Sequence, residues 1–510
     1  MKIKAPHTHG SWISHPEIKL YSEILYENKN IFKQYPYKYS FIRNLFEREA
    51  GFGSSNSPLI VTGHQPEWFH PGVWSKNFLV HQIAMSSGGV ALNCVIDSDI
   101  PKTLAWTIPK PSGCKIPTAP LLIPFIPFSE RSIPWELQKP LSTSFLFNSF
   151  SQIIENLKIF GFESMASLAI QQISKIDHSI SAARQFSDIR NKVEVKMGLK
   201  LIDLFISNIS CFSSFIELIR LFFYEIEVAF EEYNQAIVDF RLDHEIDQAG
   251  RPIPFLEKEN DWFETPLWIF SNKFPERSRF WIKVNGDSFD WRSQNAELNG
   301  RMPLSDLETF GLCIRELASS GIFIRPRALL ISLFLRVFAS DLFVHGLGGA
   351  LYDEMTDRWI RGWLGIAPPV SMVCSATFRL PFAEPMHSRF EIDELKMRLR
   401  EFRWHGESLV DASSDSDLLK SLGLEKSKLI DWSPLDELGM RARCQALNNI
   451  NKKISNIYSS SVASIYEILD HESEWTREEN LLKSREIPWI MHPVSEIKTV
   501  MNLLMNEVRV

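Results

Sequence analysis

The chain has 510 residues, of which 45% are hydrophobic and 23% are charged. This composition is typical of a globular protein with enough apolar material for two or three structural units. The net charge of −7 argues against a general nucleic-acid-binding protein, because such proteins usually carry a basic excess. The six cysteines form no CxxC pair, which predicts reduced thiols in a cytoplasmic protein. The most apolar segment, 328–344, is interrupted by Arg336 and Asp341, so we expect core elements there and no membrane span.

Residues 1–142 are predicted to form the first half of a Rossmann-like α/β core. Residues 17–50 have a helical pattern, and residues 58–100 have the pattern of a strand, a loop, a helix and a second strand, as in a βαβ unit. The second strand, 90–96, is a continuous apolar run, typical of a strand buried on both faces. Residues 101–134 contain eight prolines, which predicts an extended cover over this unit.

The rest of the chain is predicted to contain three further segments. Residues 143–244 have long apolar helical patterns, which predicts a helical insertion. Residues 245–405 are expected to form the second half of the parallel-sheet core. Their predicted elements are a hairpin at Asn285-Gly286, a helix from Met302 to Leu317, strands at 322–324 and 341–344, a helix at 328–338 and a helix containing Tyr352.

Residues 406–510 are predicted to form a C-terminal helical hairpin or coiled coil. A polar linker at 406–416 precedes a long helix that starts at Ser433-Pro434. The apolar positions of this helix follow a heptad-like spacing, and they are Leu447, Ile450, Ile454, Ile457 and Ile468. Such a seam would be exposed if left alone, so we expect it to pair within the chain or in a homodimer.

The loop between the first strand and its helix, residues 62–76, is the main candidate for a binding site. Its donors and ring systems are Thr62, His64, Gln65, Trp68, His70, Trp74 and Lys76, with Gly63 at the strand end. Lys76 lies near the start of a helix, where an ammonium and the helix dipole would jointly hold an anion. His64 could act as an acid or base. The alternative is a loop that packs its own aromatic side chains. The loop is neither a Walker loop nor GxGxxG.

Asp97 and Asp99 follow the second strand, at the place where open α/β sheets bind ligands. They could hold a magnesium ion, a ribose or an amine, or they could simply end the strand in a turn. Arg325 and Arg327 flank a proline at a later strand end and are candidates for carboxylate or phosphate recognition. Salt bridges are the alternative for this arginine pair.

A glycine-rich stretch between a strand and a helix is the last candidate. It contains His345, Gly346, Gly348 and Gly349, followed on the helix by Tyr352 and Asp353. Glycines let the backbone approach a ligand closely, although a tight turn is the alternative. The cysteines lack zinc-ligand spacing and no HExxH or GxSxG motif occurs, so no metal site is predicted.

These motifs resemble the cysteine-adding enzyme family of bacillithiol biosynthesis. That family has a Thr-Gly-Gln-Gln-Pro-x-x-Phe loop, and this chain reads Thr62-Gly63-His64-Gln65-Pro66-Glu67-Trp68-Phe69. Asp97-Ser98-Asp99 is similar to the family's Asp-His-Asp, and Gly348-Gly349 with Tyr352 is similar to its later Gly-Gly loop. Three departures are His64 for a glutamine, Ser98 for a histidine, and His345 without a counterpart. A local resemblance to the WbqC-like family, linked to sugar metabolism, involves His64, Gln65, Pro66, Pro71, Gly72 and Lys76.

The resemblance implies a ligase-like enzyme that joins an amino acid, cysteine in that family, to an amine-bearing sugar or similar small metabolite. The expected catalytic residues are His64, Asp97 and Asp99. The residues expected to bind the substrates or a nucleotide are Thr62, Gly63, Gln65, Lys76, Arg325, Arg327, His345, Gly346, Gly348, Gly349, Tyr352 and Asp353. A nucleotide and Mg²⁺ are open as cofactors. No nucleic-acid or membrane partner is expected. The alternatives are a noncatalytic small-molecule-binding or scaffold protein that dimerises through its C-terminal helices, and a WbqC-like protein of sugar metabolism.

Overall fold

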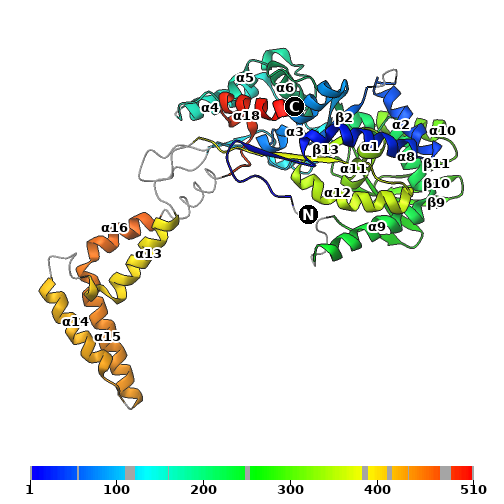
Figure 1. Cartoon of the computed structure of the whole chain (residues 1–510). Helices are drawn as coiled ribbons and strands as arrows, with labels where there is room; N and C mark the ends of the chain where they lie inside the picture. Colours follow the sequence, from blue (N-terminus) through cyan, green and yellow to red (C-terminus); the bar gives the residue numbers. More distant parts are fainter. Residues whose placement is uncertain are drawn as a thin grey trace. The chain divides into compact units, whose positions relative to one another are not determined.

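The computed structural model describes residues 3–53, 57–108, 121–158, 160–246, 253–381, 389–409, 416–434, 436–470 and 484–507. The chain divides into two compact units (Figure 1). The first unit comprises Met1–Ile108, Leu122–Leu380 and Arg485–Val510, and the second comprises Pro109–Leu121 and Pro381–Ser484. This division differs from the four segments predicted, because residues 143–244 and the end of the chain both belong to the first unit.

The first unit contains a mostly parallel sheet, with six strands among the described residues. Its order is β1 (Ser11–His15), β14 (Met372–Thr377), β13 (Leu342–His345), β2 (Leu59–His64), β3 (Val90–Val95) and β6 (Ile202–Phe205). All neighbours from β14 to β6 pair in parallel, and β1 is an antiparallel edge strand. The predicted α/β class and the predicted strand–loop–helix–strand unit are confirmed, since β2, α3 (Pro71–Ser87) and β3 follow one another.

Strand β6 shows that residues 143–244 are part of the core and not a separate insertion. Ile202–Phe205 pairs with Leu92–Val95, and Asp203 accepts hydrogen bonds from Asn93 Nδ2 and Arg190 Nη2, at 2.8 and 2.5 Å. The flanking helices contribute to the largest hydrophobic core. A four-residue strand in a mostly helical region leaves too short a pattern to be recognised in the sequence.

The helices of the first unit lie around this sheet. Helix α3 contacts β2, β3 and β14, while alternate residues of β2 such as Leu59 and Val61 join a core with α2, α8, α9 and α11. These and the other helices are α1 (Tyr21–Lys33), α2 (Tyr37–Glu49), α4 (Thr143–Lys158), α5 (Ala166–Ile170), α6 (Ala182–Lys196), α7 (Ile206–Ile209), α8 (Ser213–Tyr224), α9 (Ile226–Asp243), α10 (Leu307–Ser319), α11 (Ala328–Val337), α12 (Leu347–Trp359) and α18 (Val494–Glu507).

A second, antiparallel sheet also belongs to the first unit. Its order is β11 (Asn299–Pro303), β10 (Ser288–Ser293), β9 (Ser278–Asn285), β8 (Trp262–Ser271) and β12 (Ile322–Pro326), with β7 (Lys258–Glu259) beside β8. The predicted hairpin at Asn285-Gly286 is confirmed by the β9–β10 pairing. The predicted helix from Met302 is wrong at its start, because β11 continues to Pro303 and α10 begins after its N-cap Asp306. The strand at 322–324 was expected in the parallel core, but it pairs with β8.

The proline-rich segment contains β4 (Ala105–Ile108) and β5 (Leu121–Pro124), which pair in a two-stranded sheet. The residues between them lie outside the described ranges. The predicted extended structure is therefore confirmed for β4 and β5, whereas Phe128–Glu130 in the same segment forms a short 3-10 helix.

The second unit consists of α13 (Arg389–Trp404), α14 (Ser416–Asp431), α15 (Glu437–Ile457) and α16 (Ser459–Leu469). Ile450 and Ile454 of the predicted apolar seam are buried with Phe402, Leu419 and Tyr458. These two positions, with Ile457 packed against them, are therefore covered within the unit, while Leu447 and Ile468 are half-buried. The predicted long helix is interrupted at Tyr458, which separates α15 from α16. Most of the predicted linker, residues 410–415, lies outside the described ranges.

Candidate functional site

Three predicted segments meet at the carboxyl edge of the parallel sheet. Strands β2, β3 and β13 end at His64, Val95 and His345, and all three run in the same direction. Thr62 fixes the central pair, because its Oγ1 donates to Val344 O at 2.8 Å. Thr62 is fully buried, so its role here is to hold the two strand ends together.

Lys76 of α3 lies at the centre of this edge. Its side chain is 3% exposed, and its Nζ donates to Gly63 O at 2.8 Å. A Cβ placed on Gly346 would lie 3.8 Å from Lys76 Cδ, so the lysine stem passes along the start of α12. Burial lowers the pKa of Lys76 to about 8, and Lys102 adds to this effect. Among the described residues no carboxylate is paired with this ammonium.

Two histidines lie near Lys76 and are held in the neutral form. Burial, Lys76 and Lys102 hold the pKa of His64 well below its usual range. His64 Nδ1 lies 3.2 Å from Gln65 O; because a carbonyl only accepts, the proton is on Nδ1 and Nε2 carries the lone pair. Burial, Arg485 and Lys76 lower the pKa of His70 to about 4. The cluster thus combines a positive charge on Lys76 with two neutral imidazoles that can accept protons. Such a combination is suited to binding an anion and to acid–base chemistry.

The N-terminus of α3 is closed by the C-terminal segment of the chain. Arg485 Nη2 donates to Ser375 Oγ at 2.9 Å and to Ala376 O at 3.1 Å. A Cβ on Gly72 would lie 2.3 Å from Ala376 O and 2.6 Å from Arg485 Nη2. The glycine is therefore required by close backbone approach, and this helix end is packed against protein.

The aromatic residues of the 62–76 loop pack into the core. Trp74 stacks on Trp489 with ring centroids 4.5 Å apart, and Trp68 stacks on Trp106 and Phe186. Trp74 Nε1 donates to Glu194 at 2.7 Å. The tryptophans of the loop therefore pack in the core, as the alternative to a binding site predicted. Lys76, His64 and His70 are the residues of the loop that remain candidates for binding or catalysis.

Asp97 and Asp99 have separate partners inside the protein. Asp97 accepts from Ser207 N at 2.9 Å and from Ser207 Oγ at 2.5 Å. Burial and the nearby Glu136 raise the pKa of Asp97 to about 7. Asp99 accepts from Gln65 Nε2 and Arg277 Nη1, both at 2.7 Å. The two carboxylates therefore do not converge on a shared ligand, contrary to the expectation of a magnesium or amine site.

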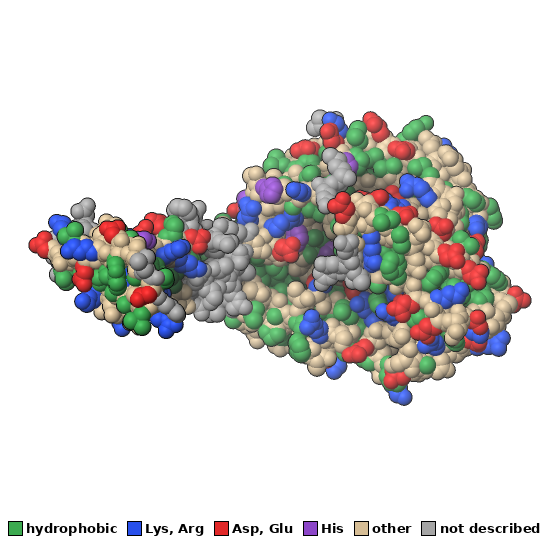
Figure 2. Space-filling view, turned by 90° about the horizontal axis from the view of Figure 1, so that it is seen from below, with side chains coloured by type: hydrophobic (Ala, Val, Ile, Leu, Met, Phe, Trp, Pro, Cys, Tyr) green, Lys and Arg blue, Asp and Glu red, His purple; other side chains and the backbone are tan. Residues whose placement is uncertain are grey.

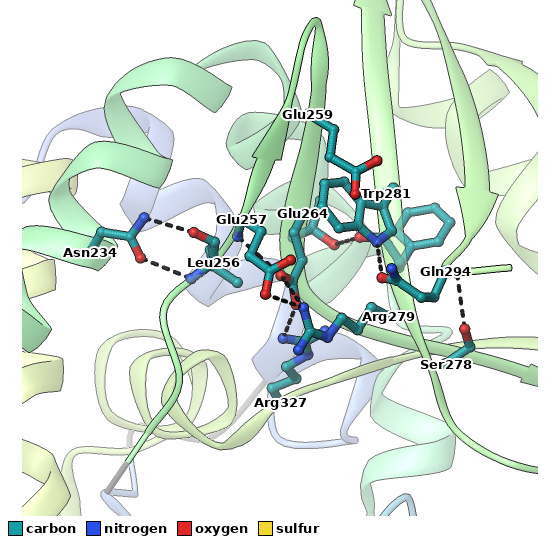
Figure 3. A network of polar contacts seen from close by, with 12 residues as sticks. Asn234, Leu256, Glu257, Glu259, Glu264, Ser278, Arg279, Trp281, Gln294 and Arg327 are labelled. Atoms are coloured by element: carbon teal, nitrogen blue, oxygen red, sulfur yellow. Dashed lines mark hydrogen bonds and ion pairs between the residues drawn. The ribbon is translucent and has the colours of Figure 1, made fainter. Parts of the chain in front are cut away.

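Arg325 in β12 and Arg327 at the N-cap of α11 are both bound to carboxylates. Arg325 makes two hydrogen bonds of 2.9 Å to Glu136. Arg327 Nη1 donates to Glu264 at 2.7 Å, and its guanidinium lies over the Trp268 ring, 4.0 Å from the centroid. In Figure 3 the guanidinium groups of Arg279 and Arg327 point toward the Glu264 carboxylate. The salt-bridge alternative holds for both arginines.

The glycine-rich stretch is the first turn of α12 rather than a loop. Gly346 is the N-cap, and Gly348 and Gly349 lie exposed in the helix. Tyr352, further along, is 38% exposed. His345 and Asp353 approach each other, with Nε2 and Oδ2 2.8 Å apart. The prediction of a glycine loop is wrong because the helix N-cap follows His345 directly.

Several groups at this edge were missed in the sequence. Arg336, seen only as a break in an apolar run, binds Asp353. A charged residue in an otherwise apolar helix signals a buried ion pair. Arg277 and Arg485 approach from distant segments, and nothing in their local sequence marks them, while Lys102 lies three residues after Asp99.

The described surface and residues add three findings. Acidic and basic side chains are interspersed on the face of the larger unit in Figure 2. Within the described ranges no group of three or more His, Cys, Asp or Glu is arranged to hold a metal ion. None of the helices in those ranges has the length and apolar character needed to cross a lipid bilayer.

No protein-family model matches the chain, and no curated protein matches it.

Proposed function

We propose that the protein is an enzyme with a Rossmann-like core that binds an anionic small molecule at the carboxyl edge of its parallel sheet. The observation that carries this proposal is Lys76, a buried ammonium with one carbonyl acceptor and no paired carboxylate among the described residues. An uncompensated buried charge costs several kcal/mol. A bound phosphate or carboxylate would offset this cost.

The proposed reaction joins an amino acid to an amine-bearing sugar or a similar small metabolite, with a nucleotide as activating group. This part of the proposal is supported by the resemblance of residues 62–69 to the bacillithiol-pathway family. Lys76 binds the anionic group, and Nε2 of the neutral His64 acts as the proton acceptor or donor. A cytoplasmic location belongs to this proposal, supported by the free thiols of all five cysteines in the described ranges.

A second candidate is a noncatalytic small-molecule-binding protein that dimerises through a coiled coil in its second unit. Two observations favour it. Asp97 and Asp99, the expected catalytic carboxylates, are bound to protein groups. The hairpin between α14 and α15 also carries exposed apolar side chains, with Trp432 43% and Leu438 81% exposed. A third possibility, a WbqC-like protein of sugar metabolism, would use the same anion site but act on a different substrate.

The test is equilibrium binding of inorganic phosphate, ADP and ATP to the full chain. Lys76→Met is compared with Lys498→Met, which removes an exposed lysine of the same unit. We expect at least one of these anions to bind and Lys76→Met to weaken it about tenfold to a hundredfold, the value of a charge-assisted hydrogen bond. Equal binding by wild type and Lys76→Met, or no binding of any anion, would refute the proposal.

A second measurement separates the enzyme from the scaffold. The protein is incubated with ATP, a mixture of amino acids and amine-bearing sugars, and the products are identified by mass spectrometry. An ATP-dependent amide product supports the ligase. Anion binding without a product, together with a dimer in sedimentation analysis that is lost when Leu438 is replaced by Glu, supports the scaffold.

A further inference from the structure

His345 is held by a buried ion-pair network at the carboxyl end of β13. Its Nε2 lies 2.8 Å from Asp353 Oδ2, and Arg336 Nη1 lies 2.7 Å from the same oxygen. Ser371 Oγ donates to that oxygen at 3.2 Å. Burial alone would raise the pKa of Asp353, but Arg336 and His345 outweigh it and hold this pKa below its usual range. Asp353 is therefore a carboxylate that fixes the imidazole from one side.

The contact with Asp353 determines which ring nitrogen is available. Nε2 lies 2.8 Å from the Asp353 carboxylate, although the contact lacks hydrogen-bond geometry. Because a lone pair that faces a carboxylate is repelled by it, the neutral imidazole favours the proton on Nε2 and the lone pair on Nδ1. Nδ1 faces the first turn of α12, where a Cβ placed on Gly349 would lie 3.0 Å away. Gly349 is exposed, and among the described residues Nδ1 has no hydrogen-bond partner. Any larger residue at this position would crowd the lone pair.

The same turn connects His345 to the lysine at the centre of the edge. Gly346, the next residue, is the one whose Cβ would lie 3.8 Å from Lys76 Cδ. Strands β13 and β2 are neighbours in the sheet, with Val344 opposite Thr62. A molecule held by the Lys76 ammonium would therefore lie beside the first turn of α12. The lone pair on His345 Nδ1 points toward this same turn.

We propose that His345 is the proton acceptor for the amine or hydroxyl group of the substrate bound beside Lys76, with Asp353 and Arg336 as positioning residues. This inference rests on the proposed function for the identity of the substrate. The N–H or O–H proton of the nucleophile moves to Nδ1, which gives an imidazolium whose charge is stabilised by Asp353. The proton leaves later with the released group or to water, so the histidine is regenerated.

The arrangement differs from a histidine used only for packing. A histidine used only for packing usually has its buried ring nitrogens hydrogen-bonded, because an unpaired buried polar atom is costly. Here one nitrogen is fixed by a charged network, and the other is covered by no side chain because residue 349 is glycine. The second histidine–carboxylate pair on α12, His244 with Glu354 at 2.6 Å, lacks both the Arg336 anchor and the neighbouring lysine.

The experiment measures the reactivity of His345 directly, without knowledge of the substrate. Diethyl pyrocarbonate acylates unprotonated imidazole nitrogens, and the rate at each histidine is followed by peptide mass spectrometry. Gly349→Ala places a methyl group 3.0 Å from Nδ1, while Gly348→Ala is the matched control because a Cβ there meets nothing within 4 Å. We expect His345 to react in wild type and in Gly348→Ala, and about tenfold more slowly in Gly349→Ala.

Two further readouts complete the test. In NMR spectra of protein labelled with ¹⁵N-histidine, the His345 signal is assigned by its absence in His345→Gln. This signal should show the tautomer protonated at Nε2. The preference should be lost in Asp353→Asn, and the signal should be unchanged in His244→Gln. Inorganic phosphate at saturating concentration should protect His345 from acylation in wild type but not in Lys76→Met.

The outcomes are separable. If wild-type His345 is unreactive, if it carries its proton on Nδ1, or if Gly349→Ala reacts as fast as Gly348→Ala, the proposal is overturned. Phosphate that binds but gives no protection also overturns it, because the two groups then do not share a site. If phosphate does not bind at all, the anion site fails while the acylation and tautomer results still decide whether His345 is an open base. Melting curves of both alanine variants confirm that they are folded.

Discussion

Replacing Lys76 by methionine should make the unliganded protein more stable while weakening anion binding. Methionine has nearly the same length and no branch, so it fits the space of the lysine stem. The substitution removes a charge whose burial lowers the pKa of Lys76 from 10.5 to about 8. A shift of this size corresponds to about 3 kcal/mol of destabilisation when the group is charged. The lost hydrogen bond to Gly63 O takes back about 1 kcal/mol, which leaves a net gain of about 2 kcal/mol at pH 7.

The pH dependence gives the sign of the effect independently. The pKa of Lys76 is lower in the folded state than in the unfolded chain, so between about pH 8 and 10.5 the unfolded chain binds more protons. The free energy of unfolding of wild type, measured relative to Lys76→Met, should therefore rise across this window. Below pH 8 the lysine is charged in both states, and the full penalty is present.

The assay is urea unfolding followed by tryptophan fluorescence at pH 7 and at pH 10, without added anions. Lys498→Met is the control, because Lys498 is exposed and its replacement should change the free energy of unfolding by less than about 0.5 kcal/mol. The reasoning is refuted if Lys76→Met is no more stable than wild type at pH 7 and the difference between them does not change with pH.

Four further substitutions test the structural assignments. Asp97→Asn should gain stability relative to wild type as pH rises from about 4 to 7, by up to about 4 kcal/mol, because the pKa of Asp97 is raised to about 7 and the folded protein holds its proton longer; thermal unfolding across this pH range measures it. Gly72→Ala should lower the free energy of unfolding by about 1–3 kcal/mol or more, and with it the melting temperature, because its methyl group would meet Ala376 O at 2.3 Å; an unchanged melting temperature would contradict the close approach. Gly348→Ala should raise the free energy of unfolding by about 0.5–1 kcal/mol, since the position is helical and open; calorimetry checks the sign. Ile454→Ala should cost the second unit about 2–5 kcal/mol, because the side chain is 1% exposed; limited proteolysis of residues 389–470 that is no faster than in wild type would show that this core is not as described.

Local patterns were sufficient for the central βαβ unit. The apolar run at 90–96 is buried on both faces of the sheet, as a parallel strand requires. Helix α3 begins with Pro71 at its first position and ends at Gly88 with φ of 66°, which are ordinary start and stop signals. The direction of β2 and β3 then places the ends of both strands at one edge, so the place of the candidate site follows from the sequence.

The antiparallel sheet and the short β6 could not be assigned in the same way. Strand β12 has the same kind of apolar pattern as a parallel strand, and only its partner β8 makes it antiparallel. Strand β6 has only four residues, and the helical patterns around it in the sequence hide its own pattern. Pairing over long separations depends on contacts that no local window contains, so the expected second half of the parallel sheet became a different sheet.

The sequence by itself determined the α/β class, the βαβ unit and the presence of Lys76 and His64 at the carboxyl edge, because these depend on residue periodicity, helix capping and strand direction. The tertiary structure decided which charged groups are free and which are bound to protein. Asp97 finds Ser207 110 residues away, Asp99 finds Arg277 178 residues away, and Arg325 finds Glu136 at a separation of 189. A carboxylate has the same local signature whether its partner is a ligand or another side chain, and only the folded chain brings that partner within hydrogen-bond distance.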